Sequence, residues 1–163
     1  MAGIRLWWAV VAIWVALASP AQAILTEENS GLDQDPNFRA AKQAVMDQDW
    51  DAAVTALGLV VADRPDSADA HAWLGYSLRR AGRFDAALRA YGEALRLSPR
   101  HLAAREYLGE AYLALDRRAD AELQLRELDR LCGVTSCEEA RQLRRAIEEH
   151  VPVRSGHDPG SQR

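Results

Sequence analysis

The sequence predicts an all-α fold for about residues 36–150, and three observations support this prediction. Alanine, leucine, arginine and glutamate, which are good helix formers, dominate the segment. Apolar residues recur at intervals of three and four, as in Leu74, Leu78 and Ala81. Prolines stand only at the boundaries of these periodic stretches, because a proline inside a helix costs about 3 kcal/mol. The segment is the right length for one domain.

The periodicity divides this segment into seven expected helices. The last of them is amphipathic, with Ala140, Leu143 and Ile147 on one face and charged residues mostly on the other. The expected helices cover residues 36–47, 50–63, 68–81, 84–97, 102–115, 118–132 and 136–150.

The chain repeats itself at a spacing of 34 residues. Small residues recur at two positions of each unit, and a proline or glycine closes it. We expect Gly75 and Ala87 to lie where the two helices of one hairpin cross, because larger side chains would force the axes apart. Gly82 is expected to end a first helix in the left-handed conformation. The aligned positions are Ala41, Gly75 and Gly109; Ala53, Ala87 and Ala121; and Pro65, Pro99 and Gly133.

The unit at residues 68–101 resembles the tetratricopeptide repeat (TPR) nearly residue for residue, in Leu74, Gly75, Gly82, Phe84, Ala87, Tyr91, Ala94 and Pro99. The resemblance implies a right-handed solenoid of three helix-turn-helix repeats, at about residues 34–67, 68–101 and 102–135. A helix at 136–150 would cap the open end, which otherwise leaves an apolar face in water. The resemblance also implies an adaptor or scaffold that binds another protein or peptide on its concave face and is not an enzyme.

By the same resemblance, the first helix of each hairpin lines the concave face. Arg79 and Arg80, together with Tyr76, would hold an acidic or extended peptide through forked hydrogen bonds and an aromatic shelf. The alternative is that these are ordinary solvated side chains. TPR proteins that clamp the C-termini of chaperones use lysine and asparagine at these positions, so that ligand class is not expected. The predicted groove residues are Phe38, Lys42, Tyr76, Arg79, Arg80, Glu106 and Glu110.

Cys132 and Cys137 are the only cysteines, and in an oxidising compartment they predict a disulfide between the last two helices. Its short loop would stabilise the fold by roughly 2 kcal/mol. The competing hypothesis is a thiol-disulfide or metal-handling accessory protein that uses this pair. It rests on a capping box of Ser136 and Glu139, which would place Cys137 in the first helical turn, where the thiol pKa falls.

The N-terminus predicts export. Arg5 precedes an apolar run from Leu6 to Ala18 that is shorter than the roughly 20 residues of a membrane span, and Ala21-Gln22-Ala23 follows as a peptidase site. We therefore expect a signal peptide at residues 1–23, cleavage after Ala23, a periplasmic or secreted protein and no stable membrane anchor. The alternative is an uncleaved N-terminal anchor. Residues 24–35 are expected to form a flexible acidic lead-in and residues 151–163 a disordered tail.

The charge and the motifs argue against several other classes of function. A formal net charge of -4 with interspersed signs gives no basic patch for nucleic acid. None of the four histidines belongs to an H-E-x-x-H motif or a Cys/His run, and no G-x-S-x-G, phosphate loop or dinucleotide fingerprint occurs. We expect no metal, no cofactor and no catalytic residues, and a homo-oligomer is a further possibility.

Overall fold

The computed structural model describes residues 30–150. The expected signal peptide and C-terminal tail lie outside this range and stay predictions. The chain divides into two units after Gly31, and the fold described below belongs to the unit that begins at Leu32.

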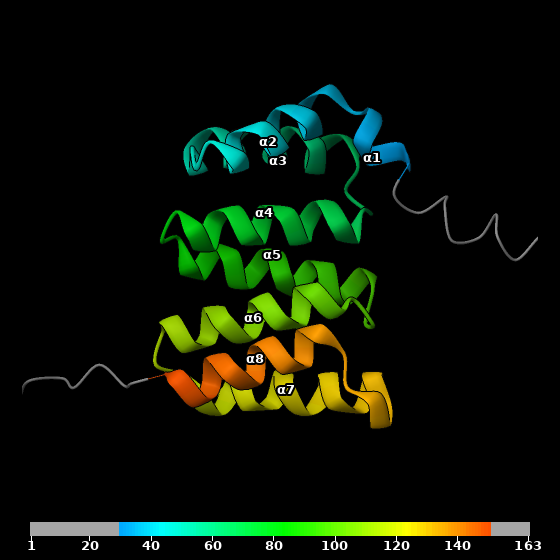
Figure 1. The fold of residues 1–163 in the computed structure, drawn as a ribbon. Coiled ribbons are helices and arrows are strands. Elements are labelled where there is room, and N and C mark those ends of the chain that lie inside the picture. Colours follow the sequence, from blue (N-terminus) through cyan, green and yellow to red (C-terminus); the bar gives the residue numbers. More distant parts are fainter. Residues whose placement is uncertain (1–29, 151–163) are drawn as a thin grey trace, which may run out of the picture. The chain divides into compact units, whose positions relative to one another are not determined.

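Three antiparallel hairpins follow one another, and an eighth helix completes the array (Figure 1). Each hairpin packs on the next one, while α8 packs on both α6 and α7. Residues 30–150 contain no strand, and none of their helices is long and apolar enough to cross a bilayer. The hairpins are α2 (Pro36–Met46) with α3 (Trp50–Asp63), α4 (Ala68–Arg80) with α5 (Phe84–Leu97), and α6 (Leu102–Ala114) with α7 (Arg118–Cys132); the 3-10 turn η2 (Gly133–Thr135) then leads to α8 (Glu138–Glu149). The predicted all-α solenoid of three hairpins and a capping helix is confirmed.

The turns inside the hairpins repeat one geometry at the spacing of the sequence repeat. Gln48, Gly82 and Asp116 have φ angles of 59°, 74° and 56°. In each turn the next N–H bonds at 2.8 Å to the carbonyl five residues earlier, as Arg83 does to Leu78. This bond satisfies a carbonyl that the end of the first helix would otherwise leave open. Gly82 behaves as predicted, whereas Gln48 and Asp116 adopt the same conformation without the sequence signal of a glycine.

The prediction of a flexible lead-in at residues 24–35 is partly wrong, because α1 (Ser30–Gln34) is a short helix. Leu32 is only 4% exposed and joins the core of the first hairpin. The buried carboxylate of Asp35 caps α2 by accepting hydrogen bonds from the N–H groups of Asn37 (2.8 Å) and Phe38 (3.3 Å). A cap of this kind contributes about 1 kcal/mol to helix stability, so the ordered domain extends upstream of Pro36.

The aligned small residues lie where the helices come together. Ala53, Ala87 and Ala121 are fully buried. A Cβ added at Gly75 would lie 2.6 Å from the ring of Tyr91, which is buried between α4 and α5. The same atom at Gly109 would meet Leu143 of α8 at 2.6 Å. Gly75 therefore allows the two helices of the second hairpin to approach closely. Gly109, at the same position of the third repeat, allows α8 to pack closely on α6.

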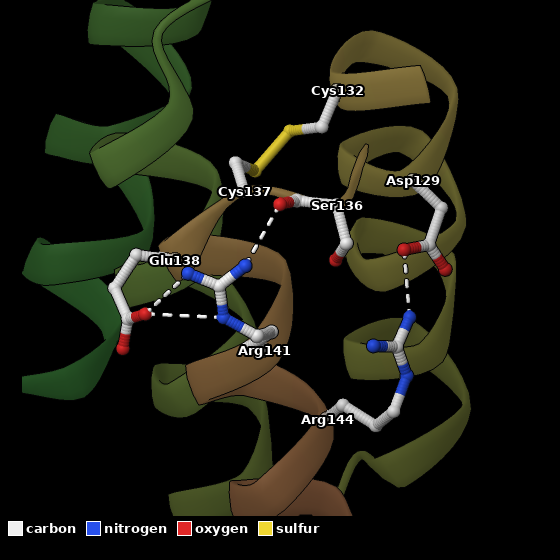
Figure 2. The surroundings of a disulfide bond; sticks show 7 residues. All are labelled: Asp129, Cys132, Ser136, Cys137, Glu138, Arg141 and Arg144. Carbon is white, nitrogen blue, oxygen red and sulfur yellow. Dashed lines mark hydrogen bonds and ion pairs between the residues drawn. A yellow bond between two sulfur atoms is a disulfide. The ribbon is translucent and has the colours of Figure 1, made fainter. Parts of the chain in front are cut away.

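The junction between α7 and α8 differs from the expected capping box. Helix α8 begins at Glu138, and the side chain of its N-cap residue, Cys137, makes no capping hydrogen bond. Ser136 has a φ of 47° and directs its carbonyl oxygen, not its hydroxyl, into the local network: this oxygen accepts a hydrogen bond from Arg141 at 2.8 Å (Figure 2). The predicted cap by Ser136 and Glu139 is therefore wrong.

Candidate binding groove

A pocket of about 360 Å³ opens along the first helices of the three hairpins. Side chains from α2, α4 and α6 form it, together with the residue before α6. The first helix of each hairpin therefore contributes to one shared pocket. The lining residues are Val45, Asp69, Ala72, Trp73, Tyr76, His101, Ala103 and Tyr107.

Three aromatic residues, Trp73, Tyr76 and Tyr107, line the pocket. Tyr76 lies at the centre, with its ring centroid 6.3 Å from that of Trp73, 5.3 Å from that of Tyr107 and 6.2 Å from that of Trp50. All four rings are half-buried. Aromatic surfaces that stay partly exposed in a concave site supply much of the energy of protein–protein recognition.

The two predicted groove arginines already have partners within the chain. Arg79 pairs with Glu110 at 2.8 Å, and its guanidinium lies 5.6 Å from the Tyr76 ring and 5.8 Å from the Tyr107 ring. Arg80 lies 4.4 Å above the Trp50 ring and donates a hydrogen bond to the Tyr76 hydroxyl at 3.0 Å. Both arginines therefore hold the aromatic rings in place, and fewer of their donors are available for a ligand.

His101 and Asp69 form the polar end of the pocket. Nδ1 of His101 accepts a hydrogen bond from the N–H of Ala104 at 3.3 Å, which caps α6 and requires this nitrogen to be unprotonated. Nε2 lies 3.0 Å from the Asp69 carboxylate but outside the angular range of a hydrogen bond, so the contact is mainly electrostatic. The ring is thereby held between two helices.

Two predicted groove residues lie deeper than expected. Phe38 is 2% exposed and meets Trp73 edge to face at 5.7 Å, so it supports the groove from the core and does not line its surface. Glu106 is 4% exposed and has no hydrogen bond or ion pair among the residues that the structure describes. Burial, with further contributions from Glu110 and Glu139, raises the pKa of Glu106 to about 7.

Lys42 is exposed on α2, three residues before Val45, and is not among the residues that line the pocket. It pairs with Asp33 at 3.0 Å, and its Nζ is 5.8 Å from the Phe38 ring. Both side chains of this ion pair are about half exposed, so the pair contributes little to stability.

Sequence reasoning missed Trp73 and Tyr107 as groove residues, although they stand 34 positions apart and occupy the same place in successive repeats. A search for large aromatic residues at the repeat spacing would have found both. Asp69 and Ala103 are related by the same spacing and were also missed.

The cysteine pair lies at the α7–α8 junction. Cys132 and Cys137 are joined by a disulfide, with their Cα atoms 5.5 Å apart. Arg144 of α8 reaches Asp129 of α7 at 2.7 Å beside it (Figure 2). Within residues 30–150, no group of three or more histidine, cysteine, aspartate or glutamate side chains could hold a metal ion.

Two solved TPR domains have a fold similar to that of this chain. The TPR2B domain of yeast Sti1 in its complex with pHsp70 has a TM-score of 0.64 and 19% sequence identity, and the match covers 69% of this chain and 90% of that chain. The Arabidopsis OM64 TPR domain has a TM-score of 0.62 and 16% identity, over 69% of this chain and 92% of that chain. A search of curated proteins finds no match.

A family model described as "Anaphase-promoting complex, cyclosome, subunit 3" matches residues 46–128, about half of the chain. The matched range covers most of the three hairpins. With its repeats, its helical hairpins and this match, the chain belongs to that family, within the tetratricopeptide-repeat superfamily.

Proposed function

We propose that this chain is an exported adaptor, which holds a segment of another protein in the groove of its first helices and has no catalytic activity of its own. The observation that carries this proposal is the pocket of about 360 Å³ with half-buried walls of Trp73, Tyr76 and Tyr107. A volume of this size accommodates one or two side chains of a peptide.

The comparisons give general support to a protein ligand. TPR folds commonly mediate protein–protein interactions, and one of the similar structures is a complex of a TPR domain with pHsp70. Nucleic acid is not the ligand that we propose, since the formal net charge of the sequence is -4 and charges of both signs are interspersed along it. We propose the periplasm or the cell exterior as its location, on the basis of the sequence of residues 1–23.

Filling the pocket tests this proposal. Ala103 lines the pocket, and phenylalanine in its place would occupy space that a ligand needs. A photoreactive amino acid at Lys42, on the exposed rim, would crosslink the partner in intact cells, and mass spectrometry would identify it. We expect Ala103→Phe to abolish most of this crosslinking.

The matched control is Ala119→Phe, which places the same ring at an exposed position of α7, away from the pocket. It should leave crosslinking unchanged. Equal crosslinking in the parent chain and in Ala103→Phe, with both chains folded, would rule out this pocket as the binding site.

The competing hypothesis of a thiol-disulfide accessory finds less support. The disulfide joins two neighbouring helices and lies in a network of ion pairs between and within them, as expected of a structural bridge. We therefore propose that Cys132 and Cys137 hold the capping helix in place.

A further inference from the structure

Three residues of the pocket wall hold hydrogen-bond donors that have no acceptor in the described part of the chain. Nε1–H of Trp73 and the hydroxyl of Tyr107 bond to no other described residue, and neither polar atom is enclosed. The Tyr76 oxygen accepts a hydrogen bond from Arg80 at 3.0 Å, so the hydrogen of this hydroxyl is left to be donated to another group. The aromatic wall therefore suits a ligand that offers acceptors.

The charged groups at the pocket balance one another. Arg79 is paired with Glu110 at 2.8 Å. One positive charge then remains on Arg80, whose guanidinium lies 5.8 Å from the Tyr76 ring, and one negative charge remains on Asp69 in the pocket wall. A charged ligand would meet one attractive and one repulsive group, so the electrostatics favour neither sign. An uncharged ligand fits this pocket best.

The rings of the wall form a row with similar steps. The Tyr76 centroid lies 6.3 Å from that of Trp73 on one side and 5.3 Å from that of Tyr107 on the other. The ring planes are inclined by 71° and 54°, so each ring can offer its own face or edge to a ligand. Two residues of a polyproline II helix advance about 6 Å, which is close to these steps. An extended segment can therefore reach the three rings in turn.

A proline-rich segment combines the properties that this wall requires. Proline has neither a charge nor an N–H group, and the polyproline II conformation leaves its carbonyl oxygens without internal hydrogen bonds. Such a backbone offers acceptors and apolar rings only. Its fixed φ angles also reduce the conformational entropy that is lost on binding. Grooves lined by aromatic residues recur among domains that bind this conformation.

We propose that the segment held in this groove is rich in proline and extended as a polyproline II helix. Its proline rings pack on Trp73, Tyr76 and Tyr107, and its carbonyl oxygens accept hydrogen bonds from the same three side chains. This inference rests on the proposed function and specifies the ligand of the same groove. It keeps the extended peptide that the sequence suggested but not its acidic character, because Arg79 and Arg80 are already engaged within the chain.

Three uncharged synthetic peptides test this proposal in calorimetric titrations of the purified chain. Each peptide has about ten residues, or roughly three turns of a polyproline II helix. The first contains proline and glutamine, the second has alanine at every proline position, and the third has leucine there. Alanine and leucine favour an α-helix, so these two peptides represent a helical or simply apolar ligand. We expect the proline peptide to bind about ten-fold more tightly than either of the others.

Added charges test the balance of the pocket. One arginine or one glutamate is added to the proline peptide. Neither charge should raise the affinity by more than about two-fold, and the affinity of the neutral peptide should change little between about 0.05 M and about 0.5 M salt. A gain of about ten-fold from either charge would overturn the inference, because the charge would then be the main feature recognised.

Two conservative variants test the assigned contacts. Tyr107→Phe keeps the ring and removes its hydroxyl, and Trp73→Phe removes the indole N–H. Each should weaken binding of the proline peptide about three- to ten-fold. Tyr112→Phe is the matched control, since Tyr112 lies on the same helix as Tyr107, packs under Arg117 and does not line the pocket. Binding that is equal in the parent chain and in both pocket variants, with all chains folded by circular dichroism, would overturn the proposal.

Ala103→Phe, which fills the pocket, separates this inference from the proposed function. It should abolish binding of the proline peptide. If the alanine or leucine peptide binds best and Ala103→Phe abolishes that binding, the proline-rich ligand is wrong and the groove remains the binding site. If no peptide binds, the proline-rich ligand is also wrong, and crosslinking in intact cells then shows whether the groove holds another segment.

Discussion

Single residues decide how closely the helices of this chain approach one another. Gly75 and Gly109 occupy the same column of the repeat, and a methyl group at either position would collide with a buried side chain at 2.6 Å. Gly92, on α5, lies in open space, with no atom within 4 Å of an added Cβ. Glycines that look alike in the sequence therefore have opposite packing requirements.

We predict that Gly75→Ala destabilises the fold by up to about 2 kcal/mol. The collision with the Tyr91 ring at 2.6 Å costs about 1–3 kcal/mol, and the better helix propensity of alanine offsets roughly 1 kcal/mol of this cost. Thermal or urea unfolding followed by circular dichroism would measure this change.

Gly92→Ala is the control for this prediction and should stabilise the chain by about 0.5–1 kcal/mol, because only the propensity changes there. Combining Gly75→Ala with Tyr91→Leu should cost less than the sum of the two single changes. A neutral or stabilising Gly75→Ala would contradict the close approach of α4 to Tyr91.

Glu106 gives a second prediction at this scale. A carboxyl group whose pKa is raised in the folded chain destabilises the fold when it ionises. This cost is absent below the unfolded pKa near 4.5, grows as the pH rises and is complete above about 7. Glu106→Gln should therefore stabilise the chain by about 3 kcal/mol at about pH 8 and have no effect at about pH 4.

Melting temperatures across this pH range would check the prediction. Glu122→Gln is the control, since Glu122 pairs with Arg118 on an exposed surface. An equal effect of Glu106→Gln at about pH 4 and about pH 8 would show that ionisation of the buried Glu106 does not destabilise the fold.

At the scale of elements, a disulfide and side-chain packing together hold the capping helix α8 on the rest of the fold. Leu143 is fully buried against Gly109 of α6, and the disulfide joins the start of α8 to the end of α7. The ion pair between Arg144 and Asp129 crosses the same junction. These contacts close the end of the solenoid that would otherwise expose an apolar face.

Replacing Cys132 and Cys137 together by serine should lower the free energy of unfolding by about 2 kcal/mol, as expected for a loop this short. The measurement is chemical unfolding of the oxidised chain, the reduced chain and the double variant. A structural bridge predicts that the reduced chain and the double variant behave alike and that mild reductant leaves the native bond intact. Ready reduction without loss of stability would instead favour the thiol-disulfide hypothesis.

At the scale of the whole molecule, export is the main prediction that the structure does not test. We expect mass spectrometry of the exported protein to find an N-terminus at Ile24, because Ala21 and Ala23 form the small-residue site of a signal peptidase. Ala23→Arg should block processing and leave a larger, membrane-associated precursor. A parent chain that keeps Met1 and stays with the membrane would favour the N-terminal anchor.

Self-association is a second property of the whole molecule that stays a prediction. The large apolar side chains that are exposed in the described part of the chain are Met46 on α2, Leu59 on α3 and Leu123 on α7. Since they come from three different helices, they do not single out one interface. Light scattering of the purified chain would establish its oligomeric state.

The sequence by itself determined the seven main helices, their pairing into hairpins and the turn at Gly82. The 34-residue spacing and residues such as Gly82 and Pro99 act locally or between neighbours in the chain, and their effects can be read without coordinates. Only the tertiary structure decided that Phe38 is buried, that Arg79 pairs with Glu110 and that Gly109 lies against Leu143. Spacing along a helix specifies which side chains share a face, whereas burial and pairing depend on the distance to the next helix and on what that helix presents.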